Sequence, residues 1–133
     1  SPASITLLNR TRSRAEAIAA DFAGLMPILT GDFENLDSAG RYDLIINATS
    51  LSLNQELPPL VEAWLQPNAC CYDMMYADTD TVFVRWAKQH GAALALDGLG
   101  MLVEQAAESF HIWRGIRPDT APVIARLRAA THA

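Results

Sequence analysis

The stretch that decides the fold is Tyr42-Asp43-Leu44-Ile45-Ile46-Asn47-Ala48. Its continuous apolar run is typical of a central strand in a parallel sheet, covered on both faces. In open α/β sheets the ligand lies beyond the carboxyl ends of the strands. The residues that follow this strand and its neighbours are therefore the first candidates for function.

Strands and helices alternate on both sides of this stretch. Further strands are predicted at residues 5–8, 26–29, 69–74 and 93–96, and helices at about 13–22, 61–65, 81–90, 101–113 and 121–130. The polar and acidic segment 31–40 is expected to be a surface connection with one helical turn. The alternation predicts an α/β fold, in which right-handed crossovers join parallel strands.

Composition excludes several classes of protein. A chain of 133 residues is long enough for one domain with a core, and its net charge of -5 argues against a nucleic-acid partner. No apolar run is long enough for a membrane span and no leader is recognisable, so we expect a cytoplasmic protein. Cys70 and Cys71 are adjacent in a predicted strand and point to opposite faces, so we expect two free thiols and no metal site.

The first strand end carries an arginine-rich run, Asn9-Arg10-Thr11-Arg12-Ser13-Arg14. Positive charge at a helix N-terminus opposes the helix dipole, so the three arginines favour an anion site over a merely solvated helix start. NAD-binding folds place an acidic residue at the end of the second strand to bond the ribose 2′-hydroxyl, and no acid stands here. Arginine matches a 2′-phosphate, so the run predicts NADP rather than NAD.

Three more strand ends carry candidate residues. Asn47-Ala48-Thr49-Ser50 is small and polar, which allows close approach of a cofactor, although such runs are common. In Tyr72-Asp73-Met74-Met75-Tyr76 the methionines could pack a nicotinamide or simply belong to the core. The run Asp97-Gly98-Leu99-Gly100 begins like a dinucleotide fingerprint, but Val103 stands where the third glycine should be, so we reject that interpretation. Met101 and Gln105 lie one helical turn apart and could contact one ligand.

Together the four segments resemble the shikimate dehydrogenase family, whose members carry the same motifs in this order and at similar spacing. The resemblance covers essentially the whole chain. It implies NADP as cofactor and, in the intact enzyme, reduction of 3-dehydroshikimate to shikimate with NADPH. The residues implied for the 2′-phosphate are Asn9, Arg10, Thr11 and Arg14; those along the ribose and nicotinamide are Thr49, Met74 and Gly98; those reaching the shikimate site are Tyr76, Gln105 and Met101.

One position departs from the family pattern. Members usually have glycine two residues after the serine of Asn-Ala-Thr-Ser, and this chain has Ser52 there. Serine adopts a positive φ less readily than glycine, so this loop and its contacts are expected to depart from the family pattern.

The resemblance also implies parts that do not precede Ile5: a substrate domain with a catalytic Lys and Asp, a first strand and a glycine-rich turn. We therefore expect a partial Rossmann-like parallel sheet over residues 1–97, followed by C-terminal helices over 98–133 that expose apolar surface. No catalytic residue is nominated in this chain, and alone it is expected to be inactive and to hold the cofactor weakly. The missing central strand would leave two open sheet edges, which favour rearrangement or self-association.

Other interpretations stay open. A quinate/shikimate dehydrogenase paralogue is the nearest enzymatic alternative, but an acidic ribose-binding residue would be expected for its use of NAD. The Asn-Arg-Thr run also resembles the nucleotide domain of glutamyl-tRNA reductase, which the segment from Asp97 to Gln105 does not fit. A non-catalytic nucleotide-binding module is the alternative from a different class.

Overall fold

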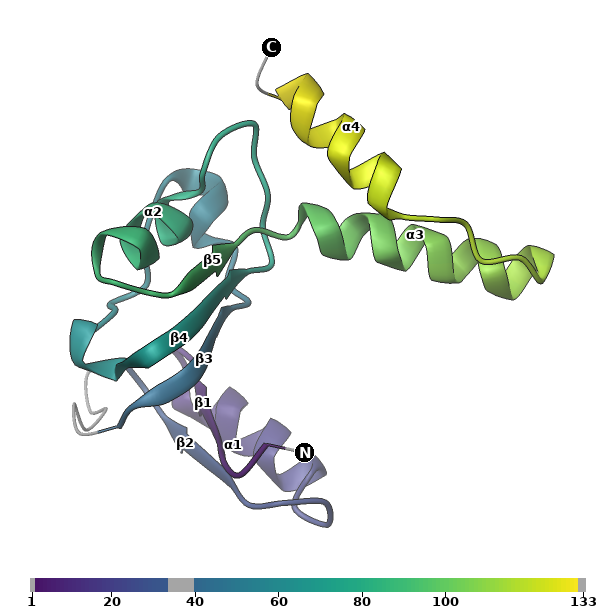
Figure 1. Cartoon of the computed structure of the whole chain (residues 1–133). Helices are drawn as coiled ribbons and strands as arrows, with labels where there is room; N and C mark the ends of the chain where they lie inside the picture. The colour runs from purple at the N-terminus through teal and green to yellow at the C-terminus, as the bar shows by residue number, and fades with distance from the viewer. Residues whose placement is uncertain (1, 34–39, 132–133) are drawn as a thin grey trace. The chain divides into compact units, whose positions relative to one another are not determined.

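The computed structural model describes residues 2–33 and 40–131, which fall into two compact units, Ser1–Gly40 and Arg41–Ala133 (Figure 1). Most of the segment predicted to hold one helical turn lies outside the described residues. Each unit is an α/β arrangement of parallel strands, as predicted. The division predicted between residues 97 and 98 concerns the C-terminal helices and stays a prediction.

The first unit is a strand–helix–strand motif. Its elements are β1 (Ile5–Leu8), α1 (Arg12–Asp21) and β2 (Ile28–Gly31). The two strands pair in parallel, and the Asn9 amide N–H donates to the Gly31 carbonyl at 3.3 Å just beyond β1. Ala15 is the buried residue of α1, and its small side chain lets the helix approach the strands closely.

The second unit contains a three-stranded parallel sheet in the order β3-β4-β5. Its elements are β3 (Tyr42–Asn47), the 3₁₀ helices η1 (Leu51–Asn54) and η2 (Glu62–Trp64), β4 (Leu65–Asp73), α2 (Val82–Gln89), β5 (Leu94–Leu96), α3 (Leu99–Arg114) and α4 (Ala121–Thr131). Strand β4 starts four residues before its predicted beginning, and the helix predicted at 61–65 is a single 3₁₀ turn. Among the described residues the strands form two separate sheets, β1-β2 and β3-β4-β5, and the expected open edges stay a prediction.

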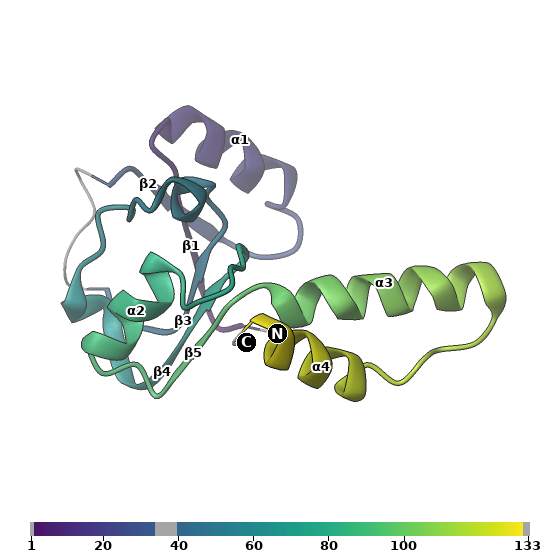
Figure 2. The same ribbon diagram turned by 90° about the horizontal axis from the view of Figure 1, so that it is seen from above.

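Helix α2 packs on one face of the three-stranded sheet and forms the core with it (Figure 2). Cys71, Phe83 and Ala87 are fully buried, and the rings of Phe83 and Trp86 stack with centroids 6.2 Å apart. Thr81 caps the helix by accepting a hydrogen bond from the Val84 amide at 3.2 Å. Burial raises the pKa of the Cys71 thiol to about 11, so this sulfur is a packing group rather than a nucleophile.

The opposite face of this sheet is exposed, which corrects the prediction that the strand at 42–48 is covered on both faces. Leu44 and Ile46 keep 52% and 55% of their surface accessible. In register with them lie the exposed side chains of Leu94 and Leu96 on β5. The apolar run predicted the strand correctly, but α2 packs on the face that carries Ile45 and leaves the face of Leu44 and Ile46 exposed.

The C-terminal segment exposes apolar side chains, as the sequence predicted. Ile112 and Trp113 on α3 are 73% and 77% accessible, and Ile116 in the connection to α4 is 66% accessible. Arg117 lies in the connection between α3 and α4. Its guanidinium donates hydrogen bonds to Glu104 and Glu108 and so holds the connection against α3. No described helix is long and apolar enough to cross a membrane.

Candidate functional site

The end of β1 is shaped by the side chain of Asn9. Its Oδ1 accepts a hydrogen bond from the amide N–H of Thr11 at 2.9 Å, which closes a tight turn before α1. Arg12 then pairs with Glu16 one helical turn later, Nε to Oε1 at 2.8 Å. The side chains of Arg10 and Arg14 are exposed and form no hydrogen bond or ion pair with any described residue. Of the three arginines, the two assigned to the 2′-phosphate are therefore the two that lack a partner among the described residues.

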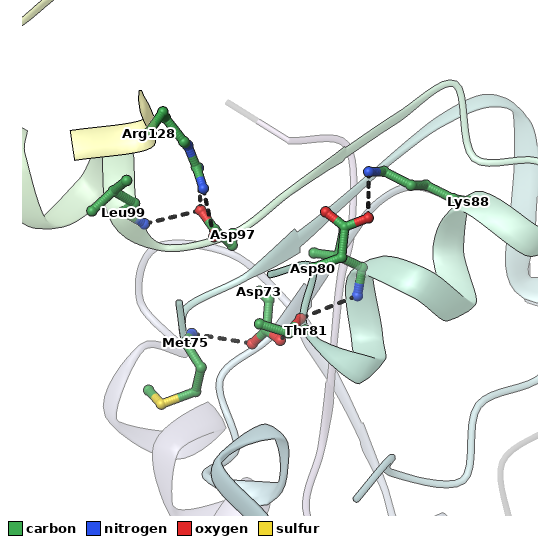
Figure 3. Close-up of polar contacts among 9 residues, drawn as sticks. Asp73, Met75, Asp80, Thr81, Lys88, Asp97, Leu99 and Arg128 are labelled. Atoms are coloured by element: carbon green, nitrogen blue, oxygen red, sulfur yellow. Dashed lines mark hydrogen bonds and ion pairs between the residues drawn. The ribbon is translucent and has the colours of Figure 1, made fainter. Parts of the chain in front are cut away.

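The ends of β3 and β4 are joined by a buried polar network around Asp73. The carboxyl group of Asp73 is fully buried and accepts four hydrogen bonds. Its donors are Asn47 Nδ2 at 3.1 Å, the Met75 amide at 3.1 Å, Ser52 Oγ at 2.7 Å and Thr81 Oγ1 at 2.6 Å. Figure 3 shows Asp73 with two of these donors, Met75 and Thr81. Four donors match the acceptor capacity of one carboxylate, so the group is satisfied without a cation. These five residues are called the Asp73 network below.

Asn47 also links the Asp73 network to Thr49 through hydrogen bonds. The Asn47 Oδ1 accepts both from the Thr49 amide at 3.1 Å and from the Thr49 hydroxyl at 2.7 Å. The backbone adds a further link, because the Met74 amide donates to the Asn47 carbonyl at 3.0 Å. Two predicted contact residues, Thr49 and Met74, are therefore held in one hydrogen-bonded assembly.

Ser52 has a role that the family pattern did not indicate. It is buried within η1, with its hydroxyl donating to Asp73 and accepting from Asn47 Nδ2 at 3.1 Å. The positive-φ non-glycine residues described are Gln55 and Asn68, so the loop requires no left-handed conformation at Ser52. The Ser52 hydroxyl forms hydrogen bonds that a glycine could not form, and the backbone at this position needs no positive φ.

Gly98 brings the start of α3 against the end of β4. Its amide N–H donates to the Met75 carbonyl at 2.9 Å. A Cβ at Gly98 would overlap the Met74 carbonyl group, whose carbon lies at 2.7 Å from that position. Glycine is required here by close backbone approach, and Gly98 is next to the predicted cofactor residue Met74.

Asp97 anchors the end of the chain to the same turn (Figure 3). Its carboxylate accepts from the Leu99 amide at 3.2 Å and from both terminal nitrogens of Arg128, with Nη1 at 2.8 Å from Oδ2. Asp97 is buried, and its hydrogen bond raises the pKa of Arg128 above the ordinary value of an arginine. The pair ties α4 to the turn that carries Gly98.

The three residues predicted for the substrate site lie in the second unit. Tyr76 follows Met75 in an exposed loop, while Met101 and Gln105 stand one turn apart on α3. The side chains of Tyr76 and Gln105 are exposed and form no hydrogen bond with the described residues. The Gly98–Met75 hydrogen bond connects the segments that carry them, but no contact among the three side chains is recorded.

Sequence reasoning missed the Asp73 network and the pairing of Asp97 with Arg128. One signal was available: Asn47, Asp73 and Asp97 each occur at a strand end, where a buried polar side chain needs partners from neighbouring loops. Among the described residues no group of three His, Cys, Asp or Glu could hold a metal ion.

Comparison with known proteins gives matches over nearly the whole chain. Residues 98–128 match the family model of the shikimate 5'-dehydrogenase C-terminal domain. A shikimate dehydrogenase (NADP(+)) of Alkalilimnicola ehrlichii is 56% identical over 127 residues, which cover 96% of this chain and 46% of that protein. Over nearly its whole length the chain is therefore similar to part of the shikimate dehydrogenases. It spans slightly less than half the length of the curated relatives it matches.

Two solved structures show the same relationship in the fold. The crystal structure of an Ael1 enzyme from Pseudomonas putida has a TM-score of 0.86 at 39% identity, over 96% of this chain and 46% of that one. The shikimate 5-dehydrogenase of Thermus thermophilus, crystallised with NADP(H) and shikimate, has a TM-score of 0.74 at 29% identity, over 96% of this chain and 46% of that one. The Rossmann-like α/β prediction is thereby confirmed for the portion that this chain represents.

Proposed function

We propose that this chain supplies the NADP-binding part of an NADP-dependent shikimate dehydrogenase, which reduces 3-dehydroshikimate to shikimate with NADPH. The observation that carries the proposal is the pair of unpartnered arginines, Arg10 and Arg14, at the carboxyl end of β1. An adenosine 2′-phosphate would give these guanidinium groups the anionic partner that the described residues do not supply. The names of the relatives support the same cofactor.

In this proposal the two units have different tasks. Arg10 and Arg14, with Asn9 and Thr11 shaping the turn, hold the 2′-phosphate. Thr49, Met74 and Gly98 lie along the ribose and nicotinamide, while Tyr76, Met101 and Gln105 contact the substrate. The cofactor supplies the hydride, and the residues of this chain bind and orient it.

The proton-transfer groups are proposed to lie outside residues 1–133. The resemblance to the family assigns them to a Lys and an Asp of the substrate domain, and we nominate no catalytic residue in this chain. The chain alone is then inactive. The proposal further places the enzyme in the cytoplasm and residues 98–133 against the substrate domain. The open sheet edges are proposed to allow the isolated chain to associate with itself.

Complementation tests the proposal. The chain is joined to the preceding portion of the Alkalilimnicola ehrlichii relative, and reduction of NADP⁺ and of NAD⁺ is measured with shikimate and with quinate. We expect shikimate-dependent reduction that prefers NADP⁺, and no activity from the unjoined chain. Preference for quinate with NAD⁺ would favour the paralogue instead. A folded chimera that binds NADP⁺ without turnover would favour a non-catalytic nucleotide-binding module.

A further inference from the structure

The Asp73 network fixes which way its hydrogen bonds run. A carboxylate accepts hydrogen bonds and donates none, so the Asn47 atom at 3.1 Å from Asp73 Oδ1 must be the amide nitrogen. The same nitrogen donates to Ser52 Oγ, whose own proton goes to Asp73 Oδ2. The orientation of the Asn47 amide is therefore set by two neighbours, and its oxygen is turned toward Thr49.

Thr49 is then left without a free donor. Its amide N–H and its hydroxyl proton both go to Asn47 Oδ1, at 3.1 and 2.7 Å. The hydroxyl oxygen accepts one long hydrogen bond from the Leu51 amide at 3.4 Å, which leaves it one lone pair, and Thr49 is a half-buried residue.

We propose that Asp73 is a positioning residue that acts through Asn47 to make Thr49 a pure hydrogen-bond acceptor for the cofactor. This inference rests on the proposed function and makes it more specific. A phosphate oxygen brings no proton at neutral pH, so Thr49 does not bind the pyrophosphate. The proposed function places Thr49 along the ribose and nicotinamide, so its donor there is either a ribose hydroxyl or the carboxamide N–H.

The first experiment removes the acceptor. Affinities of the full chain for NADP⁺ and for adenosine 2′,5′-bisphosphate are measured by titration calorimetry for the wild type, Thr49→Val and the conservative control Thr49→Ser. We expect Thr49→Val to weaken NADP⁺ binding by about five-fold and Thr49→Ser to restore it, because one neutral hydrogen bond is lost and regained. Binding of the bisphosphate, which has no nicotinamide side, should be unchanged in both variants.

The outcomes separate this inference from the proposed function. If neither the wild-type chain nor the chimera of the complementation experiment binds either ligand, the proposed function fails. If the wild-type protein binds both, and Thr49→Val binds NADP⁺ as tightly as the wild type, the assignment of Thr49 is overturned. A loss of bisphosphate affinity in Thr49→Val would also overturn it, since the side chain would then be acting on the fold or on the phosphates.

The two donor groups are distinguished with the 3-acetylpyridine analogue of NADP⁺, in which a methyl ketone replaces the carboxamide and removes its N–H. If the carboxamide donates to Thr49, Thr49→Val has no effect on binding of the analogue. If a ribose hydroxyl donates, Thr49→Val weakens binding of the analogue as much as it weakens binding of NADP⁺.

The role of Asp73 is tested by a double-mutant cycle with Asp73→Asn. If Asp73 acts through Thr49, Asp73→Asn weakens NADP⁺ binding in the wild type but causes no further loss in Thr49→Val. Additive losses would show that Asp73 only supports the fold, and would overturn its assignment as a positioning residue. Thermal melting checks that each variant is folded. If Asp73→Asn does not fold, the titrations of Thr49→Val and Thr49→Ser still test whether Thr49 accepts a hydrogen bond from NADP⁺.

Discussion

The end of β1 and the ends of β3 and β4 are built in opposite ways. At the end of β1 the arginines Arg10 and Arg14 are exposed, and nothing described in the protein neutralises them. At the ends of β3 and β4 the carboxylate of Asp73 is buried, and four neutral donors satisfy it. The first region leaves its charge available for a ligand, while the second uses its polar groups to fix the positions of loops.

This difference predicts where a substitution acts. Removing a satisfied buried group leaves its partners without hydrogen bonds and destabilises the fold. Removing an exposed charge without a partner changes recognition and leaves the fold intact. The variants below test that separation.

Asp73→Ala should have the largest effect on stability. It leaves the Asn47, Ser52 and Thr81 donors without their acceptor in a buried site, so we expect a loss of about 3–5 kcal/mol in the free energy of unfolding. Urea denaturation followed by tryptophan fluorescence measures it. Asp78→Ala, at an exposed aspartate nearby in sequence, is the matched control and should be nearly neutral. Equal stability of the two variants would contradict the claim that the Asp73 network stabilises the fold.

Gly98→Ala should have the second-largest effect on stability, because the Cβ of the new alanine would overlap the Met74 carbonyl group. We expect a loss of about 2 kcal/mol, as the start of α3 must move away from the end of β4. Gly100→Ala is the control, because Gly100 lies within α3 and a Cβ there has no atom within 4 Å. This substitution should stabilise the protein by about 0.5–1 kcal/mol. Opposite signs for the two glycines are the predicted result, and a neutral Gly98→Ala would contradict it.

Arg128→Ala should have a smaller effect. The side chain of Arg128 is 38% accessible, so solvent screens its ion pair with Asp97. We therefore expect the free energy of unfolding to fall by about 1 kcal/mol. The neighbouring exposed Arg126→Ala is the control. Hydrogen exchange should show faster exchange in α4 for Arg128→Ala alone, and unchanged protection there would mean that the pair does not hold the helix.

The double variant Arg10→Gln with Arg14→Gln should have the smallest effect on stability. Neither side chain contacts a described partner, so the free energy of unfolding should change by less than about 0.5 kcal/mol. A clear gain in urea resistance would indicate that the two charges strain the start of α1, and a clear loss would reveal a structural role.

The sequence predicted the strands, the long helices and the strand-end motifs because each depends on local periodicity and on one residue at the end of an element. The arginine run at residues 10–14 stood out for the same reason, since its charge opposes the dipole of the helix that follows. The choice of Arg10 and Arg14 within the run is implied by the family resemblance and stays a prediction. The Asp73 network could not be predicted from local pattern, because its members come from β3, η1, the end of β4 and the start of α2. The exposure of Leu44 and Ile46 was missed because an apolar run does not reveal how many helices pack on a strand.

The central claim is that Arg10 and Arg14 recognise a 2′-phosphate, and the most direct test is the affinity of the full chain for adenosine 2′,5′-bisphosphate against adenosine 5′-monophosphate. Titration calorimetry at low salt should give at least about ten-fold tighter binding of the bisphosphate. That preference should disappear in the double variant Arg10→Gln with Arg14→Gln and persist in Arg12→Gln, whose arginine pairs with Glu16 in the native protein. Equal affinity of the wild-type chain for the two nucleotides, or loss of the preference in Arg12→Gln, would contradict the account.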